Sequence, residues 1–202
     1  MFFQQPAAEP PDPPHPDLPE WVGPSKDDRG TVVATELLLA RSAHVAVVLP
    51  HVIAYPTGCL LTVEVVIRKG DLSHDDWWDL ATSATDATMP GRRWDRVLRF
   101  GLQYPDGTKV TNLDPTVGRR PDTAETTTPV GPLLSWTPTG GGGGLRHHTS
   151  HVSLWLWPLP PAEPLTVAVE WPLGGIELTT VELDGAELVA AAERSTRYWP
   201  DN

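Results

Sequence analysis

The chain has 202 residues, with 15 Lys and Arg against 26 Asp and Glu, which gives a formal net charge of −11. This balance argues against a general binder of nucleic acids or anionic membranes, because both are negatively charged themselves. No apolar run approaches the roughly 18 residues of a transmembrane helix. The start Met1–Pro6 lacks the basic and apolar regions of a signal peptide. We therefore expect a soluble cytoplasmic protein, with no nucleic-acid and no membrane partner.

Residues 1–30 are predicted to be a disordered, proline-rich acidic tail. They contain eight prolines, six acidic residues and two basic ones. Proline fixes φ and lacks a backbone donor, so it disfavours both helix and interior strand. Pro13 and Pro16 have the spacing of a signalling-domain ligand, although a solvated tail explains the same prolines. Trp21 and Val22 are the exception, since they could dock on the domain that follows.

Residues 31–202 are predicted to form a single domain, which begins with three apolar segments bounded by turn residues. Such short runs favour strands over helices. The segments are Thr31–Arg41, His44–Tyr55 and Gly58–Arg68. In the third segment every second residue from Leu61 to Ile67 is apolar, with Thr62 and Glu64 between them, which is typical of an antiparallel sheet with one solvated face. The alternation over Val33–Ala40 is weaker, and this part could be partly helical.

The second half of the chain continues the strand pattern. Arg96–Tyr104 alternates, and the Pro105-Asp106-Gly107 turn then predicts a tight hairpin into a returning strand at Lys109–Leu113. Residues 114–132 form a polar connection, and the glycine run 140–144 is expected to be a flexible hairpin tip or linker. Four more strands are expected: Leu133–Thr139, Leu145–Trp157, Leu165–Trp171 and Ile176–Leu183.

Two helices are predicted from capping residues. Asp184 with Glu187 three positions later has the pattern of a capping box, and alanines follow. Ser73 can cap a second helix up to Ala81, with aspartates near its N-terminus. The expected fold is therefore mainly β: an antiparallel β-sandwich of about eight strands with a C-terminal helix and a disordered N-terminal tail.

Several short motifs follow one another along residues 30–200. They are Phe100-Gly101-Leu102-Gln103-Tyr104, the Asp106-Gly107 turn with Thr111-Asn112-Leu113, the glycine run 140–144, Leu156-Trp157-Pro158-Leu159-Pro160-Pro161, and Glu170-Trp171-Pro172 with Gly175-Ile176. Their ordered combination resembles an uncharacterised family of hypothetical proteins common in actinobacteria. The resemblance implies one compact domain, and it implies no activity, ligand or site residue.

Histidines and aspartates suggest two metal sites, neither of which we favour. His147, His148 and His151 lie within five residues, but on a strand His148 would point away from the other two. A surface loop rich in histidine explains them as well. His74 lies among four aspartates, Asp71, Asp75, Asp76 and Asp79. Their spacing is not that of a calcium loop, and the start of a helix accounts for them. We expect no bound metal and no cofactor.

Other motifs for chemistry are incomplete. The five glycines are followed by Leu145 and Arg146, whereas a phosphate-binding loop needs Lys and Ser or Thr there. Cys59 could be a nucleophile, but it begins an apolar strand, where cysteines are usually buried and inert.

Aromatic and basic residues supply the candidate interaction surface. Trp155, Trp157 and Trp171 could share a face as a stacking platform, or they could form part of the core, which is the commoner place for tryptophan. Arg92, Arg93 and Arg96, followed by Arg99, form the basic cluster of the chain. This cluster could meet an acidic partner, or the acidic surface of the chain itself.

The functional expectation is a non-enzymatic binding or scaffolding module for a protein or another macromolecule. Long loops on a sandwich are commonly used for recognition. The alternative is a carbohydrate-active or other hydrolytic enzyme, whose carboxylates come from different strands and meet only in the folded structure.

Overall fold

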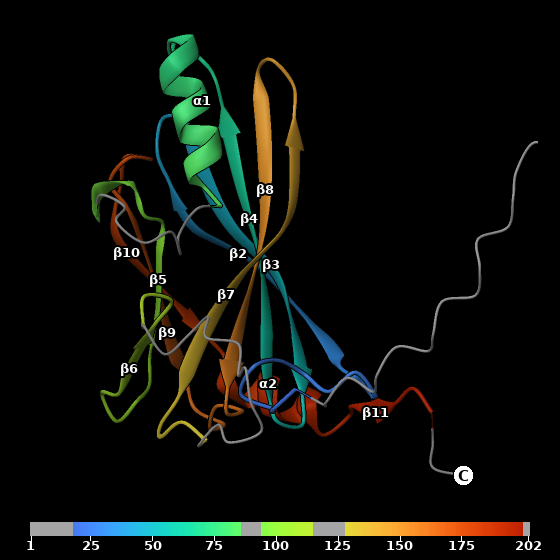
Figure 1. Cartoon of the computed structure of the whole chain (residues 1–202). Helices are drawn as coiled ribbons and strands as arrows, with labels where there is room; N and C mark the ends of the chain where they lie inside the picture. The colour runs from blue at the N-terminus through green and yellow to red at the C-terminus, as the bar shows by residue number, and fades with distance from the viewer. Residues whose placement is uncertain (1–17, 86–93, 115–127, 200–202) are drawn as a thin grey trace, which may run out of the picture.

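The computed structural model describes residues 18–85, 94–114 and 128–199. Two antiparallel sheets pack against each other in this part of the chain (Figure 1), which confirms the predicted antiparallel sandwich. The larger sheet has the order β2–β3–β4–β8–β7, formed by Thr31–Arg41, Val45–Tyr55, Gly58–Arg68, His147–Trp157 and Leu133–Gly143. The smaller sheet has the order β10–β9–β5–β6, formed by Ile176–Leu183, Leu165–Trp171, Arg99–Gln103 and Lys109–Thr111.

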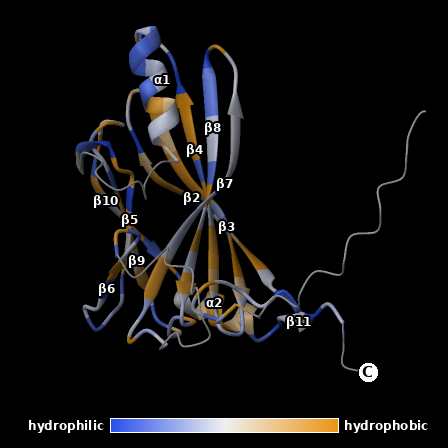
Figure 2. Ribbon diagram, in the orientation of Figure 1, coloured by the Kyte–Doolittle hydropathy of each residue, from blue (hydrophilic) through white to orange (hydrophobic). Residues whose placement is uncertain are grey.

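Alternation along the strands builds the core between the two sheets. In β4, Leu61, Val63, Val65 and Ile67 are at most 1% exposed, while Thr62 and Glu64 are half-buried on the outer face. In β5, Phe100 and Leu102 point into the same core. Figure 2 shows apolar residues concentrated along the strands, and hydrophilic residues at the end of α1 and the upper part of β8.

The weak alternation in β2 has its origin in bulges. The register of β2 against β3 shifts between Ala34 and Leu37, and again between Leu38 and Ala40. Glu36 between them has a φ of 50°. A bulge sets two residues against one on the partner strand and so interrupts the alternation. The helical alternative for Val33–Ala40 is therefore wrong.

The glycine run is a strand rather than a flexible tip or linker. Gly140–Gly143 belong to β7 and pair with His148–His151 of β8, so only Gly144, Leu145 and Arg146 make the turn. A Cβ on Gly143 would lie 2.4 Å from the carbonyl oxygen of His147. Pairing with β8 thus overrides the low strand propensity of glycine.

Both predicted helices are present. In α1 (His74–Ser83), Ser73 Oγ accepts a hydrogen bond from the Asp76 N–H, and Trp77 and Leu80 are buried. In α2 (Gly185–Ala192), Asp184 Oδ1 accepts from the N–H groups of Ala186 and Glu187 at 2.8 and 3.2 Å. A short 3-10 turn, η1 (Trp94–Arg96), precedes β5. Neither α1 nor α2, the two α-helices of the described residues, is long and apolar enough to cross a membrane.

The segment before residue 31 contributes to the domain. β1 (Asp28–Arg29) pairs with β11 (Thr196–Arg197), and Trp21 is only 9% exposed. The docking alternative for Trp21 is therefore the one the structure adopts, and the domain extends further toward the N-terminus than the expected boundary at residue 31. Residues 1–17 of the expected tail lie outside the described residues.

Candidate functional site

Three connections meet at one end of the larger sheet: the β2–β3 turn, the β4–α1 loop and the β7–β8 turn. The Arg68 N–H donates to the His44 carbonyl oxygen at 2.9 Å, and the Lys69 N–H donates to the Arg146 carbonyl oxygen at 2.8 Å. These backbone bonds fix the three connections relative to one another. Side chains that are distant in the sequence are thereby held in a common place.

A cleft of about 880 Å³ lies between α1 and the β7–β8 turn. We call it the cationic cleft. Its charged and titratable lining side chains are Arg68, Lys69, Arg146, His74 and His147, and its other walls are Gly70, Trp77, Trp78 and Gly143–Leu145. Because glycine has no side chain, Gly143 and Gly144 leave the wall on the β7 side open.

A second hollow, of about 460 Å³, adjoins the cleft and shares Arg68 and His147 with it. This hollow adds Arg41 and His44 to the cationic lining. No carboxylate lines either space among the residues that the structure describes. Positive charge is thus concentrated at one place on a chain whose formal net charge is −11.

Arg68 is held in place without being neutralised. Its Nε donates to the Ala43 carbonyl oxygen at 2.7 Å, and this leaves the two terminal nitrogens for a ligand. Within the described ranges, Arg41, Arg68, Lys69 and Arg146 form no ion pair with a carboxylate. These four cations are therefore not neutralised by ion pairs, and the aspartates of α1 line a separate hollow that shares only His74 and Trp78 with the cleft.

His44, in the turn between β2 and β3, contacts the β4–α1 loop at the same end of the sheet. Its Nε2 lies 3.3 Å from Asp71 Oδ1, and its Nδ1 is buried with no hydrogen-bond partner in the described part of the chain. Gly70, at φ 52°, passes so close that a Cβ would be 3.1 Å from the imidazole ring. Both the left-handed φ and the close approach favour glycine here.

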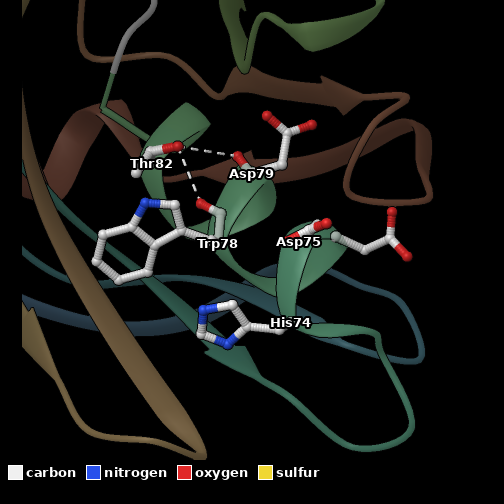
Figure 3. A pocket seen from close by; sticks show the side chains of 6 residues that line it. His74, Asp75, Trp78, Asp79 and Thr82 are labelled. Atoms are coloured by element: carbon white, nitrogen blue, oxygen red, sulfur yellow. Dashed lines mark hydrogen bonds between the residues drawn. The ribbon is translucent and has the colours of Figure 1, made fainter.

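The aspartates of α1 lie on the other side of Trp78. Figure 3 shows Asp75, Trp78 and Asp79 around a hollow of about 550 Å³ on the exposed side of the helix. Asp79 pairs with Arg96, and Asp76 accepts a bond of 2.6 Å from the Ser73 hydroxyl. Capping and ion pairing thus account for two of the aspartates, whereas Trp78 is left 62% exposed.

The structure does not bring the three predicted tryptophans together. Trp155 of β8 is 3% exposed on the outer face of the larger sheet, and Trp171 of β9 is fully buried in the core. Trp157 is half-buried and lines a small hollow of about 270 Å³ with Tyr104 and Pro158. β8 and β9 belong to different sheets, so these residues cannot form one stacking platform.

The described arginines of the predicted basic cluster form ion pairs within the chain. Arg96 pairs with Asp79, and its carbonyl oxygen accepts a hydrogen bond of 3.0 Å from the Trp171 indole. Arg99 pairs with Glu170 at 3.0 Å. Arg92 and Arg93 lie outside the described residues.

The three neighbouring histidines have separate surroundings. His147 lines the cationic cleft, while His148 Nε2 lies 3.0 Å from Ser150 Oγ. His151 Nδ1 lies 4.0 Å from Glu64 Oε1 on the outer face of the sheet. Over residues 18–85, 94–114 and 128–199, no three His, Cys, Asp or Glu side chains are grouped so as to hold a metal.

Cys59 lies in the core at the start of β4, with no exposed surface. Burial raises the pKa of its thiol to about 12. Because the thiolate is the nucleophilic form, we expect Cys59 to be unreactive at neutral pH.

Sequence reasoning considered His74, His147 and the glycine run for other roles, but it did not bring them together with Arg41, Arg68 and Lys69, although a signal for the site exists. Arg41 is the last residue of β2, Arg68 is the last residue of β4, and Arg146 immediately precedes β8. In an antiparallel sheet of this order, the end of β2, the end of β4 and the start of β8 lie at the same end of the sheet. Strand ends carrying arginine therefore point to a shared cationic site once the pairing is known.

Comparison of the chain with protein-family models, with curated proteins and with solved structures finds no match.

Proposed function

We propose that the chain is a non-enzymatic cytoplasmic binding module that takes an acidic segment of a partner protein into the cationic cleft. One observation carries this proposal. Arg41, Arg68, Lys69 and Arg146 line two adjoining hollows that contain no carboxylate among the described residues. On a chain of net charge −11, such a place attracts a local negative charge.

The chemistry of the lining favours carboxylates as the groups that bind. The terminal nitrogens of a guanidinium form paired hydrogen bonds to a carboxylate, and Arg68 is already oriented by its bond to Ala43. A long polyanion such as nucleic acid would be repelled by the rest of the acidic surface. A short acidic segment avoids that repulsion, so it is the better match.

Trp78 supports a macromolecular partner rather than a small ion. It stands at the rim of the cationic cleft with 62% of its surface exposed. Exposed tryptophans next to arginines are frequent anchors of protein interfaces. The partner would bury this ring while its acidic side chains enter the cleft.

The hydrolase alternative is less well supported by the same geometry. A glycosidase needs two carboxylates about 5–10 Å apart across its substrate. The carboxylates around the hollow of Figure 3 all come from one face of α1, and Asp79 is paired with Arg96. The cleft that could hold a substrate has no carboxylate in its described lining.

Fluorescence anisotropy with a fluorescein-labelled octaglutamate peptide tests the proposal. We expect saturable binding at low ionic strength, weakened about tenfold or more by the double variant Arg68→Gln with Arg146→Gln. An octaglutamine peptide should not bind. Added salt should weaken binding, because the cleft is open to solvent.

Arg194→Gln is the matched control. Arg194 is an exposed arginine just after α2, which lies at the opposite end of the molecule from α1 (Figure 1). In the described part of the chain its side chain donates only to the Ala190 carbonyl oxygen. This variant should bind like the unaltered chain. Equal binding by the double variant and the control would refute the cleft as the site, and circular dichroism would verify that both fold.

A further inference from the structure

The free edge of β7 offers unpaired backbone groups beside the cationic cleft. Among the strands that the structure describes, β7 is the outermost of the larger sheet and pairs only with β8. The Gly144 N–H donates to the His147 carbonyl oxygen at 2.8 Å. Because hydrogen-bonded pairs alternate along an antiparallel ladder, Gly142 also bonds to β8, and Gly141 and Gly143 direct their N–H and C=O groups outward.

The register of β7 against β8 shifts between Pro138 and Gly140, but from Gly141 to Gly143 the edge lacks the features that commonly protect an edge strand. β2 has two bulges, β10 carries Glu177 and Glu182, and β6 has only three residues. In β7, residues 140–143 are exposed and have no side chains. Charges, bulges and short length normally prevent a strand from pairing with another chain.

Packing within the chain accounts for only some of these glycines. A Cβ on Gly141 would lie 2.8 Å from the Thr149 carbonyl oxygen, and Gly140 has a φ of 150°. A Cβ on Gly142 would meet no atom within 4 Å. Glycine inside a strand weakens it and often marks the close approach of another backbone.

The charge around this edge selects the partner. From Leu133 to Trp157 the chain contains no Asp or Glu, although it has 26 such residues in all. The same hairpin carries Arg146 and three histidines, and its Gly143 and Gly144 line the cationic cleft. An extended segment lying on this edge therefore meets positive charge at the turn and no carboxylate along the hairpin.

We propose that the acidic partner segment binds in an extended conformation as a sixth strand of the larger sheet, along Gly140–Gly143. Its backbone exchanges hydrogen bonds with Gly141 and Gly143, and its acidic side chains at the turn end reach Arg146 and the cationic cleft. This inference rests on the proposed function, because it specifies the conformation in which the partner of that site binds.

Two fluorescein-labelled octapeptides of alternating Thr and Glu test the inference. They carry the same charge, but one is N-methylated at its fourth and fifth residues, which removes a central N–H from both edges of an extended strand. We expect the methylated peptide to bind at least about tenfold more weakly. In hydrogen-exchange NMR, the unmodified peptide should protect the Gly141 and Gly143 amides. The Gly107 amide, which bonds to the Tyr104 carbonyl, is the internal control.

The outcomes separate the two proposals. Equal affinities of the two peptides without protection of Gly141 and Gly143 would overturn the added strand, while the acidic site of the proposed function would stand. Absence of binding by either peptide and by octaglutamate would overturn both. Protection of Gly141 and Gly143 that rises with protein concentration, without peptide, would identify a second copy of the chain as the occupant and refute the peptide.

Discussion

The indole N–H of Trp155 donates a hydrogen bond of 3.0 Å to the carbonyl oxygen of Glu20, although 135 positions separate the two residues. Trp155 lies on the outer face of the larger sheet, and the ring of Tyr55 meets its ring edge-on at a centroid distance of 5.9 Å. Trp21, next to Glu20, is 9% exposed. The residues before β1 thus cover one end of a sheet face that the smaller sheet does not reach.

Removing this segment should destabilise the domain without preventing folding. A chain that begins at Lys26 loses the buried part of Trp21 and leaves the Trp155 indole without its acceptor. We expect the free energy of unfolding to fall by about 2–4 kcal/mol relative to a chain that begins at Leu18. Urea denaturation measures the difference. If the two chains are equally stable, the Trp155–Glu20 contact contributes nothing in solution.

Asn112 should be one of the most sensitive polar positions. Its side chain is 4% exposed, accepts a bond of 2.9 Å from the Phe100 N–H and donates one of 3.2 Å to the Leu98 carbonyl oxygen. Asn112→Ala leaves both backbone groups buried without partners and should cost about 2–4 kcal/mol. Thr111→Ala, at an exposed neighbouring position, is the control and should change stability by less than about 0.5 kcal/mol. A small effect of Asn112→Ala would mean that water replaces the amide.

Tyr104 should make the domain less stable at alkaline pH. Burial, followed by the proximity of Cys59 and Asp106, raises the pKa of its phenol to about 12. In the unfolded chain a tyrosine loses its proton near pH 10, so ionisation favours unfolding between about pH 10 and 12. The contribution of Tyr104 to the free energy of unfolding is fully present below about pH 10 and is lost as the pH rises toward 12.

Tyr104→Phe tests this sign. The Tyr104 hydroxyl is buried without a hydrogen-bond partner in the described part of the chain. The variant should be neutral or more stable by up to about 1 kcal/mol at pH 7. Its unfolding free energy, measured in urea at pH 8 and pH 11, should fall less with pH than that of the unaltered chain. An identical fall in both proteins would contradict the assignment to Tyr104.

The Cys59 thiol should resist alkylation in the native protein. With a pKa of about 12, the fraction present as thiolate at pH 8 is roughly one part in ten thousand, and the side chain has no exposed surface. Iodoacetamide should therefore label Cys59 only as fast as the domain opens, and rapidly in urea. Mass spectrometry of timed samples measures both rates. Fast labelling under native conditions would show that β4 opens locally.

The sequence by itself determined those strands and helices that are specified by residues close to one another in the chain. Leu165–Trp171 and Ile176–Leu183 were predicted with the boundaries that the structure has, because the Pro172–Gly175 turn residues separate two short apolar segments. The two helices followed from Ser73 and Asp184, since a capping side chain bonds to backbone groups two or three positions away. Such interactions need no knowledge of the rest of the fold.

Only the tertiary structure decided which residues meet. The glycine run became a strand because β8 supplies its hydrogen bonds, and β2 stayed a strand through its bulges because β3 does the same. Arg41, Arg68 and Arg146 lie in one place because the pairing of β2, β3, β4 and β8 brings their strand ends together. A sequence pattern reports whether a strand has a buried face, but not which strand lies beside it. The candidate site depends on that second fact, so it appeared only in the folded chain.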